Sequence, residues 1–315
     1  MARFLGYTHS ACLDHDTGPG HAECPERLEA VLEAVHAAFP RLEWIEAPRA
    51  TRGQLLRVHD PMLLGLVLGS HPLQRMQLDP DTVLSPGSAE AALRAAGAGV
   101  AATEAVLNGE TDVAFCAVRP PGHHATAGAA MGFCLFDNIA VAAAHALEKF
   151  GLARVAIVDF DVHHGNGTQA IFEQDARVMY LSSHESPLYP GTGDRNERGV
   201  GNLVNMPLPA GTDGAAFRQA WRERLLPALD DFAPQLLLVS AGFDGHRRDP
   251  LAGLALEADD FGWLTTELGA LAARHADGRI VSMLEGGYDL QALGECSVAH
   301  VGALLALPAH GRPVS

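Results

Sequence analysis

Six short, mainly apolar runs mark the sequence, and longer stretches with helical periodicity separate them. Apolar runs that do not alternate with polar residues are typical of parallel strands covered on both faces. In residues 25–38, apolar side chains recur at the three- and four-residue spacing of a helix with one buried face. Together the two patterns predict an α/β fold, namely an open, mostly parallel sheet with helices on both faces. The expected strands are 3–7, 113–118, 154–160, 178–182, 236–241 and 279–284, and the expected helices are 25–38, 85–107, 138–150, 213–230, 257–275 and 289–306.

The charge balance is strongly acidic, because 22 Lys and Arg residues stand against 38 Asp and Glu residues, a formal net charge of −16. Phosphate backbones need clustered positive charge, so we expect no nucleic-acid partner. No apolar run reaches the ~18 residues of a membrane span, and no secretory signal opens the chain, so we expect a cytoplasmic protein without a membrane partner. No linker or repeat divides the sequence, which predicts a single domain over residues 1–315 with one long irregular segment at 184–202.

Polar side chains follow five of the six expected strands, at the point where each strand ends. In open α/β sheets, ligands bind beyond the carboxyl ends of the strands, which all lie at one edge. We therefore expect these polar side chains to converge on one site. They are Arg119-Pro-Pro-Gly-His-His124, the stretch from Asp159 to Gly167, Ser183-His184, Gly242-Phe-Asp244 and Glu285-Gly-Gly-Tyr-Asp289.

Asp161 and His163 have the spacing of a pair of metal ligands. Residues i and i+2 of an extended segment point to the same side, so a carboxylate and an imidazole can share one ion. Asp244, from another strand end, supplies a third ligand. Two carboxylates and one histidine leave an open position, which suits a catalytic zinc site, although Fe(II) and Mn(II) also accept such ligands. The competing interpretation is a solvated strand end that binds nothing.

The adjacent histidines His123 and His124 form a second candidate group. Behind the Pro-Pro-Gly turn both rings could reach one site, where Asp159 could orient His123 and Asn166 could orient His124. A carboxylate raises the basicity of its imidazole partner, whereas an amide only fixes the tautomer. Tyr288 follows a glycine turn and offers a hydroxyl that can donate to an oxyanion. The alternatives are two loop histidines on the surface and a buried tyrosine bonded to the backbone.

Taken together, these motifs resemble the histone deacetylase superfamily, in its zinc-dependent, class II-like branch of bacterial deacetylase-like amidohydrolases and acetylpolyamine amidohydrolases. The resemblance covers about residues 5–300, and the motifs occur in the same order. One departure is Ala22, where a proline is usual. The motifs are GHAECPERL at 20–28, RPPGHH at 119–124, GFCLFDN at 132–138, VDFDVHHGNGTQ at 158–169, SAGFDGHRRDPLAG at 240–253 and EGGY at 285–288.

The resemblance implies the arginase/deacetylase type of α/β fold and a role for each matching residue. His124 matches the general base of the histidine dyad, and Tyr288 matches the tyrosine that polarises the amide carbonyl. The zinc ligands would be Asp161, His163 and Asp244, and the dyad with its partners would be His123, His124, Asp159 and Asn166. The acyl-lysine tunnel would be lined by Gly132, Phe133 and Tyr189, with Leu251 at its rim. Arg27 matches an arginine near an acetate-release channel, and Asp159, Asp161, His163 and Ser182 resemble a structural potassium site.

These matches predict a zinc-dependent enzyme that removes acetyl or another short acyl group from acyl-lysine or a related acylated amine. The main alternative is an acetylpolyamine deacetylase, for which Asp14 and Asp16 could attract a cationic substrate; Leu251 favours lysine-type or neutral amides instead. A binuclear manganese ureohydrolase would need more aspartates and no EGGY tyrosine. A non-catalytic acyl-lysine reader would lack a ligand, a dyad histidine or the tyrosine, and none is lost here. The sequence leaves open the physiological substrate, the acyl preference, the native metal and the oligomeric state.

Overall fold

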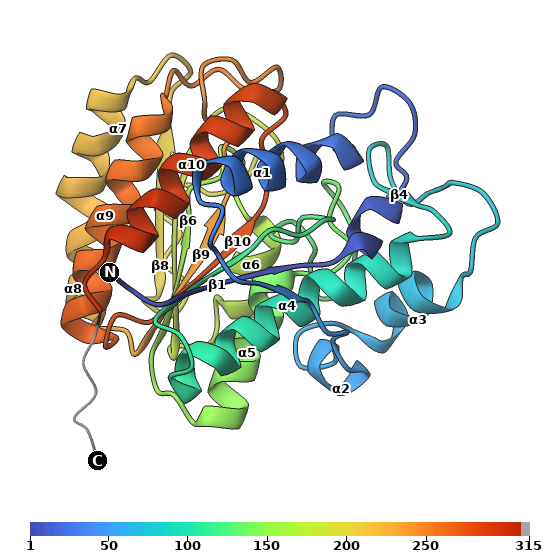
Figure 1. The fold of residues 1–315 in the computed structure, drawn as a ribbon, viewed down its shortest axis with the longest axis horizontal. Helices are drawn as coiled ribbons and strands as arrows, with labels where there is room; N and C mark the ends of the chain where they lie inside the picture. Colours follow the sequence, from blue (N-terminus) through green and yellow to red (C-terminus); the bar gives the residue numbers. More distant parts are fainter. Residues whose placement is uncertain (310–315) are drawn as a thin grey trace.

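An eight-stranded parallel sheet lies at the centre of the computed structural model, which describes residues 1–309 (Figure 1). The strand order is β2-β1-β5-β10-β9-β6-β7-β8, and every neighbouring pair runs parallel. The open parallel sheet predicted from the sequence is therefore confirmed. The last six residues of the predicted domain, 310–315, lie outside the described part. The strands are β1 (Phe4–Thr8), β2 (Trp44–Glu46), β5 (Val113–Cys116), β6 (Val155–Asp159), β7 (Val178–Glu185), β8 (Leu203–Leu208), β9 (Leu236–Ala241) and β10 (Ile280–Leu284), and a separate hairpin pairs β3 (Met76–Gln77) with β4 (Val83–Leu84).

Helices cover both faces of this sheet. On one face, α4 and α5 pack against each other and against the central strands, whereas α1, α9 and α10 form a layer on the other face (Figure 1). None of the helices in residues 1–309 combines the length and the apolar character needed to cross a membrane. The helices are α1 (Pro25–Ala38), α2 (Arg52–Leu55), α3 (Pro61–Gly69), α4 (Ser88–Asn108), α5 (Asn138–Phe150), α6 (Asn166–Phe172), α7 (Gly214–Ala220), α8 (Leu226–Phe232), α9 (Ala258–His275) and α10 (Leu290–Ala306), with a 3₁₀ turn η1 (Ser10–Asp14) and a π-helical turn η2 (Trp221–Leu225).

Burial explains why the central strands are apolar throughout. Every residue of β5, β6, β9 and β10 is buried, because helices cover both sides of the sheet at its middle. The edge strands β2 and β8 are partly exposed, so their sequences are less uniformly apolar. Neither strand was predicted from the sequence. The irregular segment expected at 184–202 starts later than predicted. The strand β7 continues through His184 and Glu185, which are polar but buried. The helix expected at 213–230 is interrupted by the π-helical turn.

The strand order brings the polar strand ends together. The sequence β5-β10-β9-β6-β7 is continuous in the sheet, so the five strand ends with polar residues are neighbours. Asp159 at the end of β6 pairs in register with Ser240 of β9 and with Ser182 of β7. One edge of the sheet therefore carries all the candidate functional residues that follow a strand.

Candidate active site

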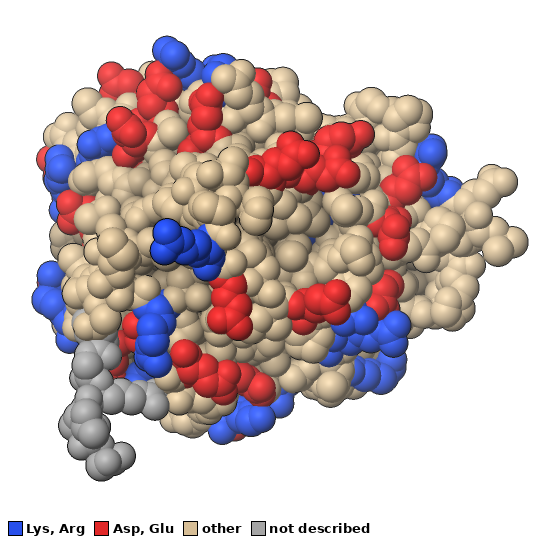
Figure 2. All heavy atoms as spheres, viewed as in Figure 1, with Lys and Arg blue, Asp and Glu red and all other residues tan. Residues whose placement is uncertain are grey.

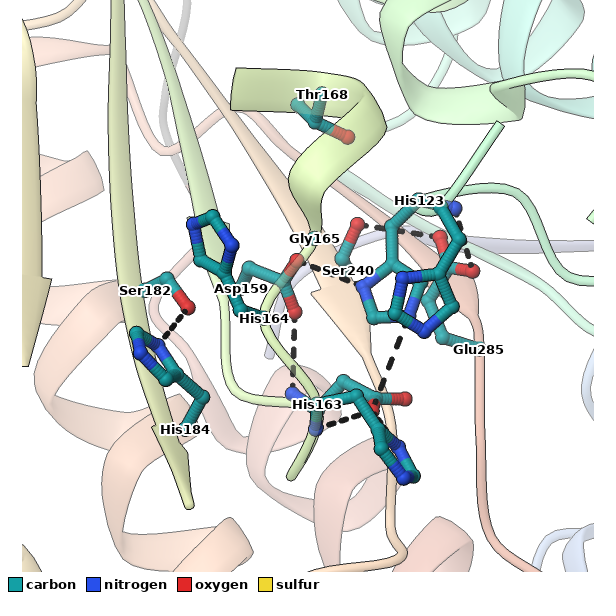
Figure 3. A network of polar contacts seen from close by, with 12 residues as sticks. His123, Asp159, His163, His164, Gly165, Thr168, Ser182, His184, Ser240 and Glu285 are labelled. Atoms are coloured by element: carbon teal, nitrogen blue, oxygen red, sulfur yellow. Dashed lines mark hydrogen bonds and ion pairs between the residues drawn. The ribbon is translucent and has the colours of Figure 1, made fainter. Parts of the chain in front are cut away.

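A buried group of two carboxylates and one imidazole lies beyond the ends of β6 and β9. Asp161 and His163 follow β6, Asp244 follows β9, and their ligand atoms all lie within 4.8 Å of one another. Nδ1 of His163 is 3.1 Å from both Asp161 Oδ1 and Asp244 Oδ2. The three residues that the sequence placed together thus meet at one point, and Figure 3 shows His163 beside the polar network that extends from it.

Backbone groups hold both carboxylates in place. Gly286 N donates to Asp161 Oδ2 at 2.8 Å, and Val162 N donates to Asp244 Oδ1 at 2.9 Å. A Cβ atom on Gly286 would overlap the carboxylates of both Asp244 and Asp161, and one on Gly242 would overlap that of Asp161. The chain can approach the acids this closely only because both positions are glycine.

The donor set fits a divalent metal ion. Two buried carboxylates packed around one imidazole require a positive charge between them, because buried like charges repel strongly. Two oxygen ligands and one nitrogen ligand, with room for a further ligand, match the requirements of a catalytic zinc or iron(II) ion. This cluster, which we call the Asp–His–Asp site, is the candidate metal site.

Without a metal ion, a proton on His163 supplies the positive charge between the two carboxylates. Burial lowers the pKa of His163, but hydrogen bonds to Asp161 and Asp244 outweigh it and raise the pKa to about 10. At neutral pH the metal-free imidazole is therefore protonated, and an incoming metal ion must displace that proton.

We expect metal binding at pH 7 to release about one proton per ion, and affinity to fall as the pH is lowered, since the proton and the metal compete for His163. Zinc titrations of metal-free protein in buffers of different ionisation enthalpy measure the number released. A number close to zero would show that His163 is already neutral in the metal-free protein.

The adjacent histidines each meet the partner expected from the sequence position. Nδ1 of His123 lies 2.9 Å from Asp159 Oδ2, and Nδ1 of His124 lies 2.8 Å from Asn166 Oδ1. The two rings are 4.1 Å apart between centroids, and both are buried. Asp159 accepts a second hydrogen bond from the Tyr180 hydroxyl at 2.9 Å, so its carboxylate is fixed from two sides.

The two imidazoles have opposite proton affinities. Burial lowers the pKa of His123, but the charges of Asp159 and Asp161 outweigh it and raise the pKa well above the usual value. Burial also lowers the pKa of His124, and the charges of His123 and His163 lower it further. At neutral pH His123 is therefore protonated, whereas His124 is neutral and able to accept a proton.

Glu285 supports the dyad, although its role was not predicted from the sequence. Its Oε2 accepts hydrogen bonds from Gly122 N at 2.7 Å and from His123 N at 3.2 Å, and Ser240 Oγ donates to Oε1 at 3.2 Å (Figure 3). The available signal was its position directly after an apolar strand, at the edge where the other polar residues converge. Burial raises the pKa of Glu285 to about 7.

One cavity of about 240 Å³ joins these residues to the expected tunnel residues. Phe133 and Tyr288 approach each other edge to face across it, with 5.8 Å between ring centroids. Asp81 and Leu188 also line the cavity and were not predicted. Asp81 lies between β3 and β4, outside the main sheet, and Leu188 is an apolar residue that belongs to none of the motifs. The lining consists of Asp81, His124, Gly132, Phe133, His163, Leu188, Tyr189, Leu251 and Tyr288.

Arg27 lies behind the Tyr288 turn rather than among these lining residues. It is fully buried, donates from Nε to Gly287 O at 2.6 Å and from Nη2 to Glu285 O at 2.5 Å, and pairs with Glu23 at 3.0 Å. Its guanidinium carbon is 4.8 Å from the centre of the Tyr288 ring. These contacts fix the turn that presents the tyrosine; a role in product release stays a prediction.

Ser182 lies beside Asp159 in the sheet register, and its Oγ is 2.9 Å from Nδ1 of His184 (Figure 3). Asp159 Oδ1 also accepts a hydrogen bond from Asp161 N at 3.1 Å. The four residues expected at a potassium site are therefore neighbours, and the potassium ion itself stays a prediction.

Comparison with known proteins agrees with this geometry. Residues 21–304 match the family described as "Histone deacetylase domain". The chain belongs to the histone deacetylase family. It is 43% identical to the histone deacetylase-like amidohydrolase of Pseudomonas aeruginosa, covering 93% of this chain and 83% of that protein. It is 36% identical to the chloroplastic histone deacetylase 14 of Arabidopsis thaliana, covering 96% and 76%.

A solved structure supports the same assignment. The crystal structure of the HDA15 HD domain superposes with a TM-score of 0.91 at 34% identity, covering 97% of this chain and 90% of that one. The protein is thus an enzyme of the deacetylase and amidohydrolase family, and the family implies an acylated substrate.

Proposed function

We propose that this histone deacetylase family member is a zinc-dependent deacylase, formed as a single domain, that removes acetyl or another short acyl group from acyl-lysine. Iron(II) is the alternative metal. The observation that carries the proposal is the single cavity in which His124, His163 and Tyr288 meet between the aromatic rings of Phe133 and Tyr189. An apolar, narrow cavity with polar groups at its base suits a linear acylated side chain whose amide reaches those groups.

Asp161, His163 and Asp244 would hold the metal. Bound there, a divalent ion supplies Lewis-acid chemistry, which polarises an amide carbonyl and makes water more acidic. The neighbouring protein groups then have to position the amide, move protons and stabilise the charge that develops on the carbonyl oxygen.

His124 is suited to act as the general base and then as the general acid. Its Nδ1 is engaged by Asn166, so Nε2 is the nitrogen available to take a proton from the attacking water. The water oxygen bonds to the carbonyl carbon, the C–N bond breaks, and His124 returns the proton to the leaving amine. The second proton of the water, carried by the new carboxylic acid, also passes to the amine, so the products are a carboxylate and an ammonium group. The protonated His123 stabilises the negative charge nearby.

Tyr288 is suited to donate a hydrogen bond to the developing oxyanion. Burial raises the pKa of its phenol, and although Arg27 opposes this, the pKa stays well above the usual value. The hydroxyl therefore remains protonated and acts as a donor.

The acidic surface is compatible with a substrate that yields a cationic amine. Figure 2 shows acidic and basic side chains mixed over the face in view, and among the coloured residues there is no broad basic area. An acidic protein attracts cationic chains through its overall field. The expectation that nucleic acid is not a partner stays a prediction.

A polyamine deacetylase remains the second candidate, and one residue favours it. Among the described residues that line the active-site cavity, Asp81 is the one carboxylate, and it could attract a cationic substrate. Asp16, by contrast, is paired with Arg75 at 2.9 Å, so its charge is already compensated. The apolar Leu251 at the rim continues to favour acyl-lysine.

A rate comparison on zinc-loaded enzyme tests the two candidates. Acetyl-lysine peptides, longer acyl-lysine peptides and acetylated polyamines are compared side by side, and we expect the highest kcat/KM on an acyl-lysine peptide. Asp81→Asn is the matched variant, and it should depress polyamine turnover more than peptide turnover because it removes only the charge. Activity restricted to polyamines would overturn the acyl-lysine proposal, and inactivity on all three would overturn deacylation of these amines.

Asp249 is placed to position Tyr288 without touching the substrate. Its Oδ2 accepts a hydrogen bond from Tyr288 N at 2.7 Å, and its Oδ1 accepts one from Leu251 N at 2.9 Å. We expect Asp249→Ala to lower kcat about tenfold, because misplacing a catalytic group by even ~1 Å is costly. Steady-state kinetics should show a smaller change in KM.

A double-mutant cycle separates positioning from general destabilisation. In a Tyr288→Phe background, Asp249→Ala should cause little further loss of kcat, because the hydroxyl it positions is already absent. Additive losses would show that Asp249 acts on something other than Tyr288.

A further inference from the structure

Three arginines lie together near the β8 edge of the sheet without a carboxylate partner. Arg195 and Arg198 belong to residues 186–202 between β7 and β8, and Arg224 lies in the π-helical turn η2. Within residues 1–309 none of these three forms an ion pair, whereas most of the other arginines do. Unpaired cations in a group stand out in a chain with a net charge of −16.

The backbone carbonyl of Arg195 holds the other two guanidinium groups together. It accepts hydrogen bonds from Nη1 of Arg198 and from Nη2 of Arg224, the latter at 3.2 Å. Nε of Arg224 is buried and has no hydrogen-bond partner among the described residues. Grouped positive charges without carboxylate partners favour binding of an anion at this point.

A surface cavity of about 510 Å³ opens beside Arg198 and Arg224. Its walls are mainly apolar, with Leu203 of β8 and Phe232 of α8 among them, and Asp231 is the one carboxylate among the described residues that line it. Cavities of ~300–1,000 Å³ with apolar walls and a few polar groups are of the kind that binds small organic ligands. The volume leaves room for a molecule much larger than an inorganic anion.

We propose that this cavity, the arginine pocket, binds an organic anion with one carboxylate or phosphate head and an apolar body. Guanidinium groups pair with both kinds of head through charge-assisted hydrogen bonds, and both Arg198 and Arg224 line the cavity. The body lies along Leu203 and Phe232. Asp231 repels a second negative charge, which limits the ligand to a single anionic end.

The arginine pocket shares a segment with the active-site cavity. Residues 186–202 carry Tyr189, which lines that cavity, and Thr192 Oγ1 lies 2.7 Å from Nδ1 of His164, next to a metal ligand. A ligand bound to Arg198 therefore holds the same segment that forms one wall of the substrate tunnel.

Isothermal titration calorimetry on the zinc-loaded protein tests the pocket, with octanoate, octyl phosphate, inorganic phosphate and octanol as probes. At least one octyl anion should bind, and phosphate and octanol should bind at least about tenfold more weakly. Arg198→Gln and Arg224→Gln should each weaken binding about tenfold. Arg222→Gln is the matched control: its guanidinium lies 4.8 Å from the centre of a Trp263 ring, and its loss should leave the affinity unchanged.

The outcomes separate the elements of the proposal. Preference for octanoate or for octyl phosphate identifies the head group. Absence of binding, equal binding of octanol or phosphate, or unchanged affinity in the Arg198→Gln/Arg224→Gln double variant overturns the proposal. Calorimetry needs no turnover, so a protein that binds an octyl anion but hydrolyses no acylated amine would contradict the proposed function and leave the arginine pocket intact.

Discussion

Replacing Asp244 by alanine should abolish metal binding and with it the deacylase activity. Asp244 contributes one of the two carboxylates of the Asp–His–Asp site, so its loss leaves one carboxylate and one imidazole. Removal of a hydrogen-bonding partner behind a metal ligand typically costs ~10–100-fold in affinity or activity, and removal of the ligand itself should cost considerably more. Elemental analysis after dialysis against zinc, together with kcat/KM, measures both effects.

Two further variants serve as controls for the Asp244→Ala result. Asp244→Asn keeps the size of the side chain and an acceptor for Val162 N, so the fold should be retained while metal affinity falls. Asp259→Ala removes an exposed aspartate from the first turn of α9 and should change neither metal content nor activity. Full zinc occupancy in Asp244→Ala would exclude Asp244 as a ligand.

Replacing Tyr288 by phenylalanine should leave zinc binding intact and reduce kcat by ~10²–10³-fold, which corresponds to about 2.7–4 kcal/mol of lost oxyanion stabilisation. The hydroxyl is the only group removed, and the ring retains its edge-to-face contact with Phe133. Pre-steady-state and steady-state assays on the peptide substrate measure kcat, and elemental analysis measures zinc.

Tyr189→Phe is the matched control, because Tyr189 lines the same cavity and its ring packs against His124 at 5.1 Å between centroids. Its hydroxyl has no assigned role in the reaction, so the variant should retain kcat. A Tyr288→Phe enzyme with kcat close to that of the wild type would remove this hydroxyl from the mechanism.

The sequence predicts the centre of the sheet better than its edges. The strands β5, β6, β9 and β10 are apolar because helices cover both their faces, and this burial is visible as uninterrupted apolar runs. The strand β8 is only half-buried and contains Pro207, so its pattern is weak. Residues at strand ends, such as Asp161 and Asp244, were located because parallel topology brings them to one edge.

Residues supplied by irregular segments were harder to predict. Asp81 lies in the short β3–β4 connection, and nothing in its local sequence indicates that this connection reaches the cavity. Asp249 accepts a hydrogen bond from the backbone of Tyr288, a contact between residues 39 positions apart in the chain. Such contacts depend on tertiary packing, which periodicity and spacing do not encode.

Each residue of the four-residue turn from Glu285 to Tyr288 is held by hydrogen bonds, which limits how far this turn can be redesigned. Its side chains and backbone hold His123, the proposed metal ligand Asp161 and the proposed catalytic Tyr288 at once, so a substitution that widens the tunnel from this side would disturb all three. Phe133 and Leu188 line the same tunnel from segments outside the turn. Altered acyl-chain selectivity is therefore best sought at Phe133 and Leu188, where pocket shape can change while the reacting groups stay in position.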